Sequence, residues 1–85
     1  MMNINDLMGE KIAIHCETEE QSKVLMEILK THGCRTLPFS FWSIYKEKTC
    51  YNLSRYKNTE YSDKEFYIDE RWEVIKFEHI INESY

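Results

Sequence analysis

The chain has 85 residues, which is enough for one domain built around a single small hydrophobic core. It carries 11 Lys and Arg against 15 Asp and Glu, a net charge of −4, and 42% of its residues are hydrophobic. This composition excludes a disordered tail, and the absence of any run of about 18 apolar residues argues against a membrane span.

The N-terminus and the cysteines indicate the compartment. The opening sequence MMNINDLMGEK has neither the basic start nor the apolar segment of a secretory signal. The chain has 3 cysteines, an odd number, which without an export signal indicates reduced thiols. We therefore expect a cytoplasmic protein.

Residues 11–33 predict a strand followed by an amphipathic helix. Residues 11–16 alternate apolar side chains and are rich in β-branched residues, as strands are. Thr18 and Gln21 fit the capping box that begins many helices, and Gly33 fits the left-handed position that ends them. The apolar side of this helix consists of Val24, Leu25, Ile28 and Leu29.

The middle of the chain predicts two strands and a loop. Residues 41–45 and 49–54 are rich in aromatic and β-branched residues, and they are joined by the charged residues 46–48. This connection lacks Gly, Asn and Asp, so a tight two-residue hairpin is not expected. Residues 55–59 then form a polar loop, with Asn58 as its turn residue.

The last third predicts a short helix and a final strand. A second capping box at residues 62–65 begins a helix that continues to Ile68, and residues 73–78 alternate as a strand does. Residues 1–10 form a short helical or flexible arm. The prediction is a single α+β domain over residues 1–85, with a small antiparallel or mixed sheet and one main helix packed on one face. The element order is β-α-β-β-(short α)-β.

Metal binding and catalysis have little support in the sequence. His15 and Cys16 precede the main helix and His32 and Cys34 follow it, but neither C-x2-C nor H-x3–5-H spacing occurs. Cys16, just before the helix, is the best-placed candidate nucleophile, but buried core thiols explain all three cysteines without any catalytic role. No glycine-rich phosphate loop is present. We expect no enzyme activity, no catalytic residue, no cofactor and no metal.

Charge is distributed unevenly along the chain. Residues 1–30 carry six acidic and three basic residues, residues 31–58 carry one acidic and five basic, and residues 59–85 carry eight acidic and three basic. The basic middle third also holds half of the aromatic residues. It predicts an alternative function, the binding of a nucleotide or of single-stranded nucleic acid by stacking and charge. The candidate residues are Trp42, Tyr45, Arg55, Tyr56 and Lys57.

The acidic flanks predict a different function, the binding of a basic groove on another protein. Inhibitors of nucleic-acid enzymes commonly work by such charge complementarity. An ordinary solvated surface is the alternative interpretation of each single charge. The candidate protein-binding residues are Glu17, Glu19, Glu20, Glu27, Asp63, Glu65, Asp69 and Glu70.

Several short stretches make the chain similar to a group of small Firmicute phage and prophage proteins, and residues 2–7 resemble the start of an anti-CRISPR protein. The chain departs from the phage group around residues 35–39, RTLPF. The resemblance carries no catalytic signature and no functional residues. The similar residues are 14–20, Trp42, Tyr45, 49–51, 61–67 and 73–77.

Together these observations predict a non-enzymatic phage or mobile-element accessory protein that acts by stoichiometric binding in the host cell cytoplasm. Its most specific form is an anti-CRISPR-like inhibitor of a bacterial nucleic-acid-targeting defence system, so the partner is a bacterial protein or ribonucleoprotein. Nucleic acid or nucleotide is the second choice of partner, and no membrane is expected. An exposed strand edge or aromatic patch would also favour self-association.

Overall fold

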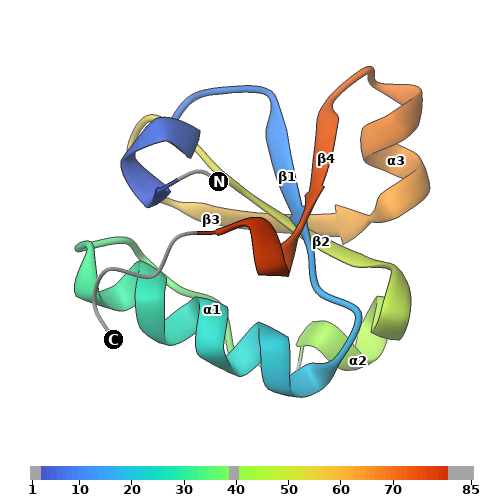
Figure 1. The fold of residues 1–85 in the computed structure, drawn as a ribbon, viewed down its shortest axis with the longest axis horizontal. Helices are drawn as coiled ribbons and strands as arrows, with labels where there is room; N and C mark the ends of the chain where they lie inside the picture. The colour runs from blue at the N-terminus through green and yellow to red at the C-terminus, as the bar shows by residue number, and fades with distance from the viewer. Residues whose placement is uncertain (1–2, 39–40, 81–85) are drawn as a thin grey trace.

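A computed structural model describes residues 3–38 and 41–80 and shows an α+β fold with one main helix and a four-stranded mixed sheet (Figure 1). The predicted fold class and element order are therefore confirmed. One-turn 3-10 helices lie at Ile4–Leu7, Lys46–Lys48 and Phe77–His79. The helices and strands, in chain order, are β1 (Ile12–His15), α1 (Glu19–Thr31), α2 (Trp42–Tyr45), β2 (Thr49–Leu53), β3 (Thr59–Asp63), α3 (Lys64–Asp69) and β4 (Glu73–Lys76).

The strands lie in the order β3-β2-β1-β4, so β1 and β2 form the centre of the sheet. β1 is antiparallel to β2, with Ile14 opposite Tyr51, and parallel to β4, with Ile14 opposite Ile75. β2 and β3 pair antiparallel along their whole length. The single parallel pair makes the sheet mixed.

The two ends of α1 form as the sequence predicts. The Thr18 hydroxyl oxygen accepts a hydrogen bond from the backbone N–H of Gln21, at 3.1 Å. The Gln21 side chain accepts in turn from the N–H of Glu17, one residue before the amide that a standard capping box uses. Gly33 ends the helix with a φ of +78°, a conformation that glycine adopts without strain.

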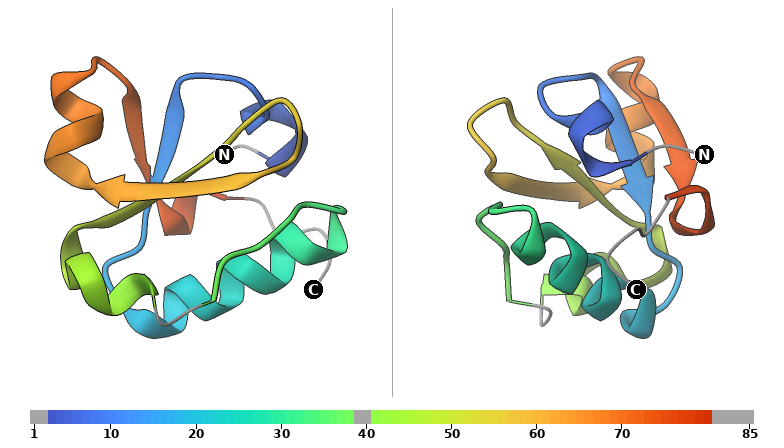
Figure 2. Two further views of the ribbon diagram at one scale, coloured as in Figure 1. Left: turned by 180° about the vertical axis from the view of Figure 1, so that it is seen from behind. Right: turned by 60° about the vertical axis from the view of Figure 1, so that its left-hand side comes forward.

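The sheet separates two apolar clusters of very different size. Figures 1 and 2 show α1 and α3 on its two sides. α1 covers one face, where its side chains pack against Ile14, Tyr51 and Ile75. We call this side the α1 face. α3 covers part of the opposite face, the α3 face, where Tyr67 packs with Ala13 and Cys50. Alternate residues of β1 and β2 thus point to different helices, as strand geometry requires.

The prediction of a strand at residues 41–45 is wrong, because these residues form the short helix α2 (Trp42–Tyr45). Their aromatic composition favours a strand, but tertiary contacts override it. The indole N–H of Trp42 donates to the carbonyl of Cys16 at 3.1 Å, and the Thr49 hydroxyl donates to the carbonyl of Trp42. Lys46 then reverses the chain with a φ of +52°.

The strand β3 was not predicted as a strand. The sequence patterns placed its first residue in a loop and its last two residues at the start of a helix. Its sequence, TEYSD, is mostly polar because β3 lies at the edge of the sheet and only Thr59 is fully buried there. Tyr61 gives the strand an apolar contact, since its ring stacks on that of Phe41 with centroids 5.0 Å apart. An edge strand of this kind lacks the alternation that makes a strand visible in a sequence.

Smaller predictions at the ends of elements shift by one or two residues. Asp63, not Ser62, caps α3, because its carboxylate accepts from the N–H of Phe66 at 3.0 Å. Lys57, not Asn58, takes the left-handed conformation in the loop between β2 and β3. β4 ends at Lys76, two residues before the predicted end, and the residues beyond 80 lie outside the described chain.

The N-terminal segment contributes to the core. Ile4 and Leu7 are fully buried in the 3-10 helix, and Asn3 caps that helix with its side chain. Among the helices of residues 3–38 and 41–80, none has the length and apolar character that crossing a membrane requires.

Candidate functional site

The acidic residues predicted to bind a partner lie on both faces of the sheet and do not form one surface (Figure 1). Glu17, Glu19 and Glu20 are exposed at the N-terminal end of α1, and Glu27 is exposed two turns further along. The other four belong to α3 or flank it, on the opposite side of the sheet. A flat partner would therefore contact either the carboxylates of α1 or those around α3. Glu17 lies next to the second group, since it lines a groove together with Lys64 and Ile68.

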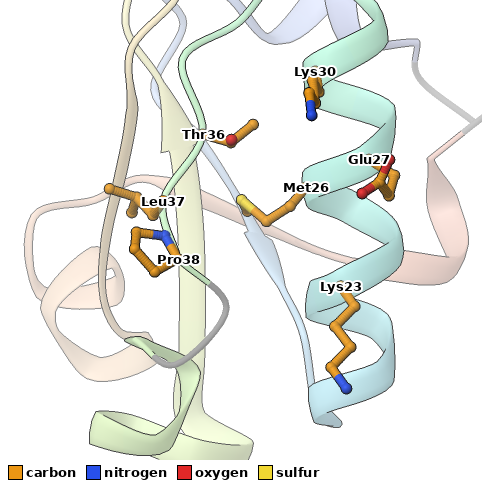
Figure 3. Close-up of a pocket in the computed structure, with 7 residues that line it drawn as sticks. All are labelled: Lys23, Met26, Glu27, Lys30, Thr36, Leu37 and Pro38. Carbon is orange, nitrogen blue, oxygen red and sulfur yellow. The ribbon is translucent and has the colours of Figure 1, made fainter.

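Glu27 lies in a mixed-charge setting. It lines a groove of about 390 Å³, the α1 groove, together with residues of α1 and of the segment that follows it (Figure 3). Lys23 and Lys30 lie on the same helix at spacings that place them near Glu27. Met26 points from α1 toward Leu37 (Figure 3). Since both signs of charge alternate along this side of α1, it does not form an acidic face.

α3 combines carboxylates with exposed apolar side chains. Glu65 and Asp69 lie four residues apart, so they share one side of the helix, away from the buried Tyr67. Phe66 is 47% exposed and Ile68 is 52% exposed. We call Glu65, Phe66, Ile68, Asp69 and Glu70 the α3 surface.

Asp63 and Glu65 have partners in the chain. Asp63 was predicted to bind a partner, but it is half-buried because it caps α3, so it is less available for such a contact. The Glu65 carboxylate lies 3.8 Å from the ammonium of Lys48, with both side chains well exposed. An exposed ion pair of this kind contributes little to stability and can open when a partner binds.

The predicted basic aromatic centre is split between the two ends of β2. Trp42 and Tyr45 lie in α2, just before β2, whereas Arg55, Tyr56 and Lys57 lie in the loop after it. A strand of five residues is about 16 Å long, so these groups cannot contact one base together. Trp42 and Tyr45 are half-buried, and the Trp42 ring packs against the main core. Arg55, Tyr56 and Lys57 are exposed.

Arg55 and Tyr56 line a second groove, of about 430 Å³, which we call the hairpin groove. The Arg55 guanidinium carbon lies 5.0 Å from the centre of the Tyr56 ring, and Arg55 also donates to the Tyr56 hydroxyl at 3.0 Å. Tyr56 is 71% exposed. Lys11 and Trp72 line the same groove from other parts of the chain.

Sequence reasoning missed Trp72. The fold brings it to the hairpin groove from the turn between α3 and β4, where its ring also meets the edge of the Tyr67 ring, with centroids 5.2 Å apart. The available signal was a large aromatic residue between charged neighbours, in the sequence ERWE. That signal indicates a surface aromatic but gives no position in space.

The three cysteines are buried thiols. Burial raises the pKa of Cys16 far above its ordinary value, and the nearby Cys50 and Glu78 add to the rise. Burial also raises the pKa of Cys34, and the charge of Lys57 partly offsets this rise. A thiol that stays protonated is a poor nucleophile and a poor metal ligand.

The histidines and cysteines around α1 are not brought together. The ring of His32 donates from Nδ1 to the carbonyl of Ile28 at 2.9 Å, while His15 lies in β1 and bonds to Glu47. Within residues 3–38 and 41–80, no three His, Cys, Asp or Glu side chains converge as metal ligands would. Comparison with protein-family models, with curated proteins and with solved structures gives no match for this chain.

Proposed function

We propose that this protein acts without catalysis, by stoichiometric binding, and that its most specific role is to inhibit a bacterial nucleic-acid-targeting defence system in the manner of anti-CRISPR proteins. The α3 surface carries this proposal. It combines two large apolar side chains, each about half exposed, with three exposed carboxylates, two in α3 and Glu70 at its C-cap.

This combination suits a basic partner. Proteins that bind nucleic acid neutralise its phosphates with Lys and Arg, so their binding grooves are positively charged. Carboxylates on the α3 surface would compete for the same groups and speed association by electrostatic steering. Phe66 and Ile68 would supply the desolvated contacts that usually provide most of the binding energy at a protein interface. The resemblance to phage and prophage proteins also supports the proposal.

The test is a plasmid-interference assay in bacteria that carry a CRISPR system, with and without this protein. We expect the wild-type protein to restore plasmid transformation. The variant Glu65→Lys/Asp69→Lys should lose this protection, because it reverses two charges on the α3 surface. The matched control is Glu10→Lys/Glu73→Lys, which makes the same change in charge at two exposed carboxylates outside the α3 surface and outside the predicted protein-binding residues.

The control variant should protect as well as the wild type. Equal loss in both variants would show that net charge, and not the α3 surface, matters. A wild-type protein that protects against none of the defence systems tested, and that forms no complex with their purified effectors, would contradict the proposal itself.

The hairpin groove favours a second candidate function, the binding of a nucleotide or of single-stranded nucleic acid. Tyr56 offers an exposed ring for stacking, and the cations Arg55 and Lys11 line the same groove, together with the carboxylates Glu10 and Glu60. A thermal-shift screen against nucleotides and oligonucleotides tests it, because a ligand of the folded state raises Tm. Tyr56→Ala should abolish the shift, and Tyr45→Ala, at the other end of β2, should preserve it.

A further inference from the structure

A third groove, the α3 groove, lies on the α3 face of the sheet and has a volume of about 400 Å³. It is separate from the hairpin groove, with which it shares only the side chain of Trp72. Its size is in the range of small-molecule sites. The groove is lined by His15, Glu17, Lys64, Ile68, Trp72, Val74, Ile75 and Lys76.

His15 gives the groove a buried polar atom without a partner. The side chain is 9% exposed, and its Nε2 lies 2.6 Å from the backbone carbonyl oxygen of Glu47. Because a carbonyl oxygen can only accept, Nε2 must carry a hydrogen. In the neutral ring Nδ1 is then an acceptor, and it makes no hydrogen bond to residues 3–38 or 41–80. A buried acceptor in this state favours a ligand that brings a donor.

Two lysines make the groove positive on an acidic protein. Lys76 lies directly opposite His15 in the pairing of β1 with β4, so the two side chains stand on the same face of the sheet. Lys64 approaches from the start of α3, close enough for its charge to lower the pKa of the Cys50 thiol. In the described part of the chain, neither lysine forms an ion pair. Glu17 is the one carboxylate in the lining.

The rest of the lining is apolar. Ile68 is 52% exposed, and Trp72 and Val74 are half-buried. An ion alone would leave these surfaces in water, whereas a ligand with an apolar body would cover them. Burial of apolar surface stabilises a complex by roughly 25 cal/mol per Å². The lining therefore suits a molecule with an anionic end and an apolar end.

We infer that the α3 groove binds a phosphate monoester carried on a small apolar body, with Lys64 and Lys76 facing the anionic oxygens and a P–OH group donating to Nδ1 of His15. At pH 6.5 roughly a quarter of a phosphate monoester is the monoanion that has both anionic oxygens and a P–OH group, since its second pKa is about 6. A carboxylate is a weaker fit, because an ionised carboxylate has no hydrogen to donate to Nδ1. This inference does not depend on the proposed inhibitor function.

Isothermal titration calorimetry and NMR with phenyl phosphate as the probe test the inference at pH 6.5. We expect saturable binding of one molecule, together with a change in the ¹⁵N shifts of the His15 ring. Benzoate and inorganic phosphate should bind at least about tenfold more weakly, since benzoate lacks the P–OH group and inorganic phosphate lacks the apolar body. Benzoate binding as tightly as phenyl phosphate would overturn the assignment of a phosphate.

A pair of matched variants locates the site. Lys64→Met/Lys76→Met removes both charges but keeps the length of the side chains, and should weaken binding at least about tenfold. Lys23→Met/Lys30→Met makes the same change at the α1 groove (Figure 3) and should leave binding unchanged. Arg55→Met, at the hairpin groove, should also leave it unchanged.

The ring shift of His15 in the wild type keeps the test decisive if the Lys64→Met/Lys76→Met variant does not fold. Phenyl phosphate that leaves the His15 ring unperturbed would overturn the inference. Equal affinity in the folded Lys64→Met/Lys76→Met variant would overturn it as well. Loss of binding in Arg55→Met alone would move the site to the hairpin groove.

Discussion

The two faces of the sheet differ in how completely they are covered. On the α1 face, a helix of 13 residues buries Leu25, Ile28 and Leu29 against the strands, and the N-terminal 3-10 helix adds to the same cluster. On the α3 face, a helix of 6 residues buries only Tyr67 over Ala13 and Cys50. The incomplete cover leaves the α3 groove and the hairpin groove open on that side.

This difference separates stability from binding. The α1 face holds most of the apolar area that folding buries, so changes there act on the whole domain. The α3 face holds exposed apolar side chains, an unpaired histidine nitrogen and lysines without ion pairs, all within the described residues. Such groups contribute little to folding, but they suit the recognition of another molecule.

The largest effect should come from a core deletion on the α1 face. Leu29 is fully buried, and Leu29→Ala should lower the free energy of unfolding by about 2–5 kcal/mol, from lost burial and the cavity left behind. Ile68→Ala, on the half-exposed α3 surface, should change it by less than about 0.5 kcal/mol. Urea unfolding followed by circular dichroism measures both. Equal costs would mean that the two faces do not differ.

Two buried tyrosines offer a matched pair, one on each face. The hydroxyls of Tyr51 and Ser22 share a hydrogen bond of 2.6 Å under α1, and the Tyr67 hydroxyl donates to the side-chain oxygen of Asn52 under α3. Tyr51→Phe and Tyr67→Phe should each cost about 1–3 kcal/mol, because each leaves a buried polar partner unpaired.

The two variants should lose a similar amount of stability, although the apolar clusters around the two tyrosines differ greatly in size. The cost of an unpaired polar group depends on its own burial, and both partners are buried. Urea unfolding of both variants beside the wild type gives the comparison. If Tyr67→Phe cost nothing, water would reach the Asn52 side chain and the α3 face would be more open than the structure indicates.

Alkaline pH should destabilise the protein from both faces. Burial raises the pKa of Cys50 on the α3 face and of Tyr51 on the α1 face to about 12 in each case. Lys64 partly offsets the rise at Cys50, as the hydrogen bond to Ser22 does at Tyr51. The unfolded chain therefore loses these protons at a lower pH than the folded chain, so stability falls as pH rises.

The fall should begin near pH 8, about one unit below the ordinary cysteine pKa of 9.0, and continue toward pH 12. Each group contributes a slope of about 1.4 kcal/mol per pH unit where only its unfolded form is ionised. Urea unfolding at pH 8, 9, 10 and 11 measures the slope. Cys50→Ala should make it shallower by the share of that one thiol. A stability that stays constant over this range would contradict the burial of these groups.

Sequence patterns predicted the α1 side of the fold better than the α3 side. The Thr18 cap, the apolar stripe of the helix and Gly33 act locally, so their spacing alone specifies α1. The sequence predicted a strand at residues 41–45, whereas the sheet contains Thr59–Asp63 instead. Which of the two segments joins the sheet depends on contacts between residues distant in sequence. The bond from Trp42 to Cys16 and the stacking of Phe41 on Tyr61 are two of them.

For the candidate binding residues, the sequence indicated the acidic side chains but not their places in the fold. Charge counts identified the carboxylates of α3, yet only the fold shows that Glu27 lies on the opposite side of the sheet from them. The α3 groove combines His15, Lys64 and Lys76, which are up to 61 positions apart in the sequence. No local pattern connects them, because strand pairing brings them together.

The smallest effect should come from the helix caps, and it distinguishes the two faces most finely. Thr18→Ala and Asp63→Ala each remove a side chain that accepts from a first-turn N–H, at a cost of about 1 kcal/mol. Ser62→Ala, at the position that the sequence suggested as the cap, should cost less because Ser62 makes no capping bond.

Global unfolding in urea should show the loss for Thr18→Ala, since α1 is part of the main core. For Asp63→Ala we expect a further change in native-state hydrogen exchange, with faster exchange confined to the amides of α3, because a short helix over a small cluster can open while the rest stays folded. If exchange in Asp63→Ala rose uniformly over the whole domain, α3 would unfold only with α1, and the two faces would form one cooperative unit.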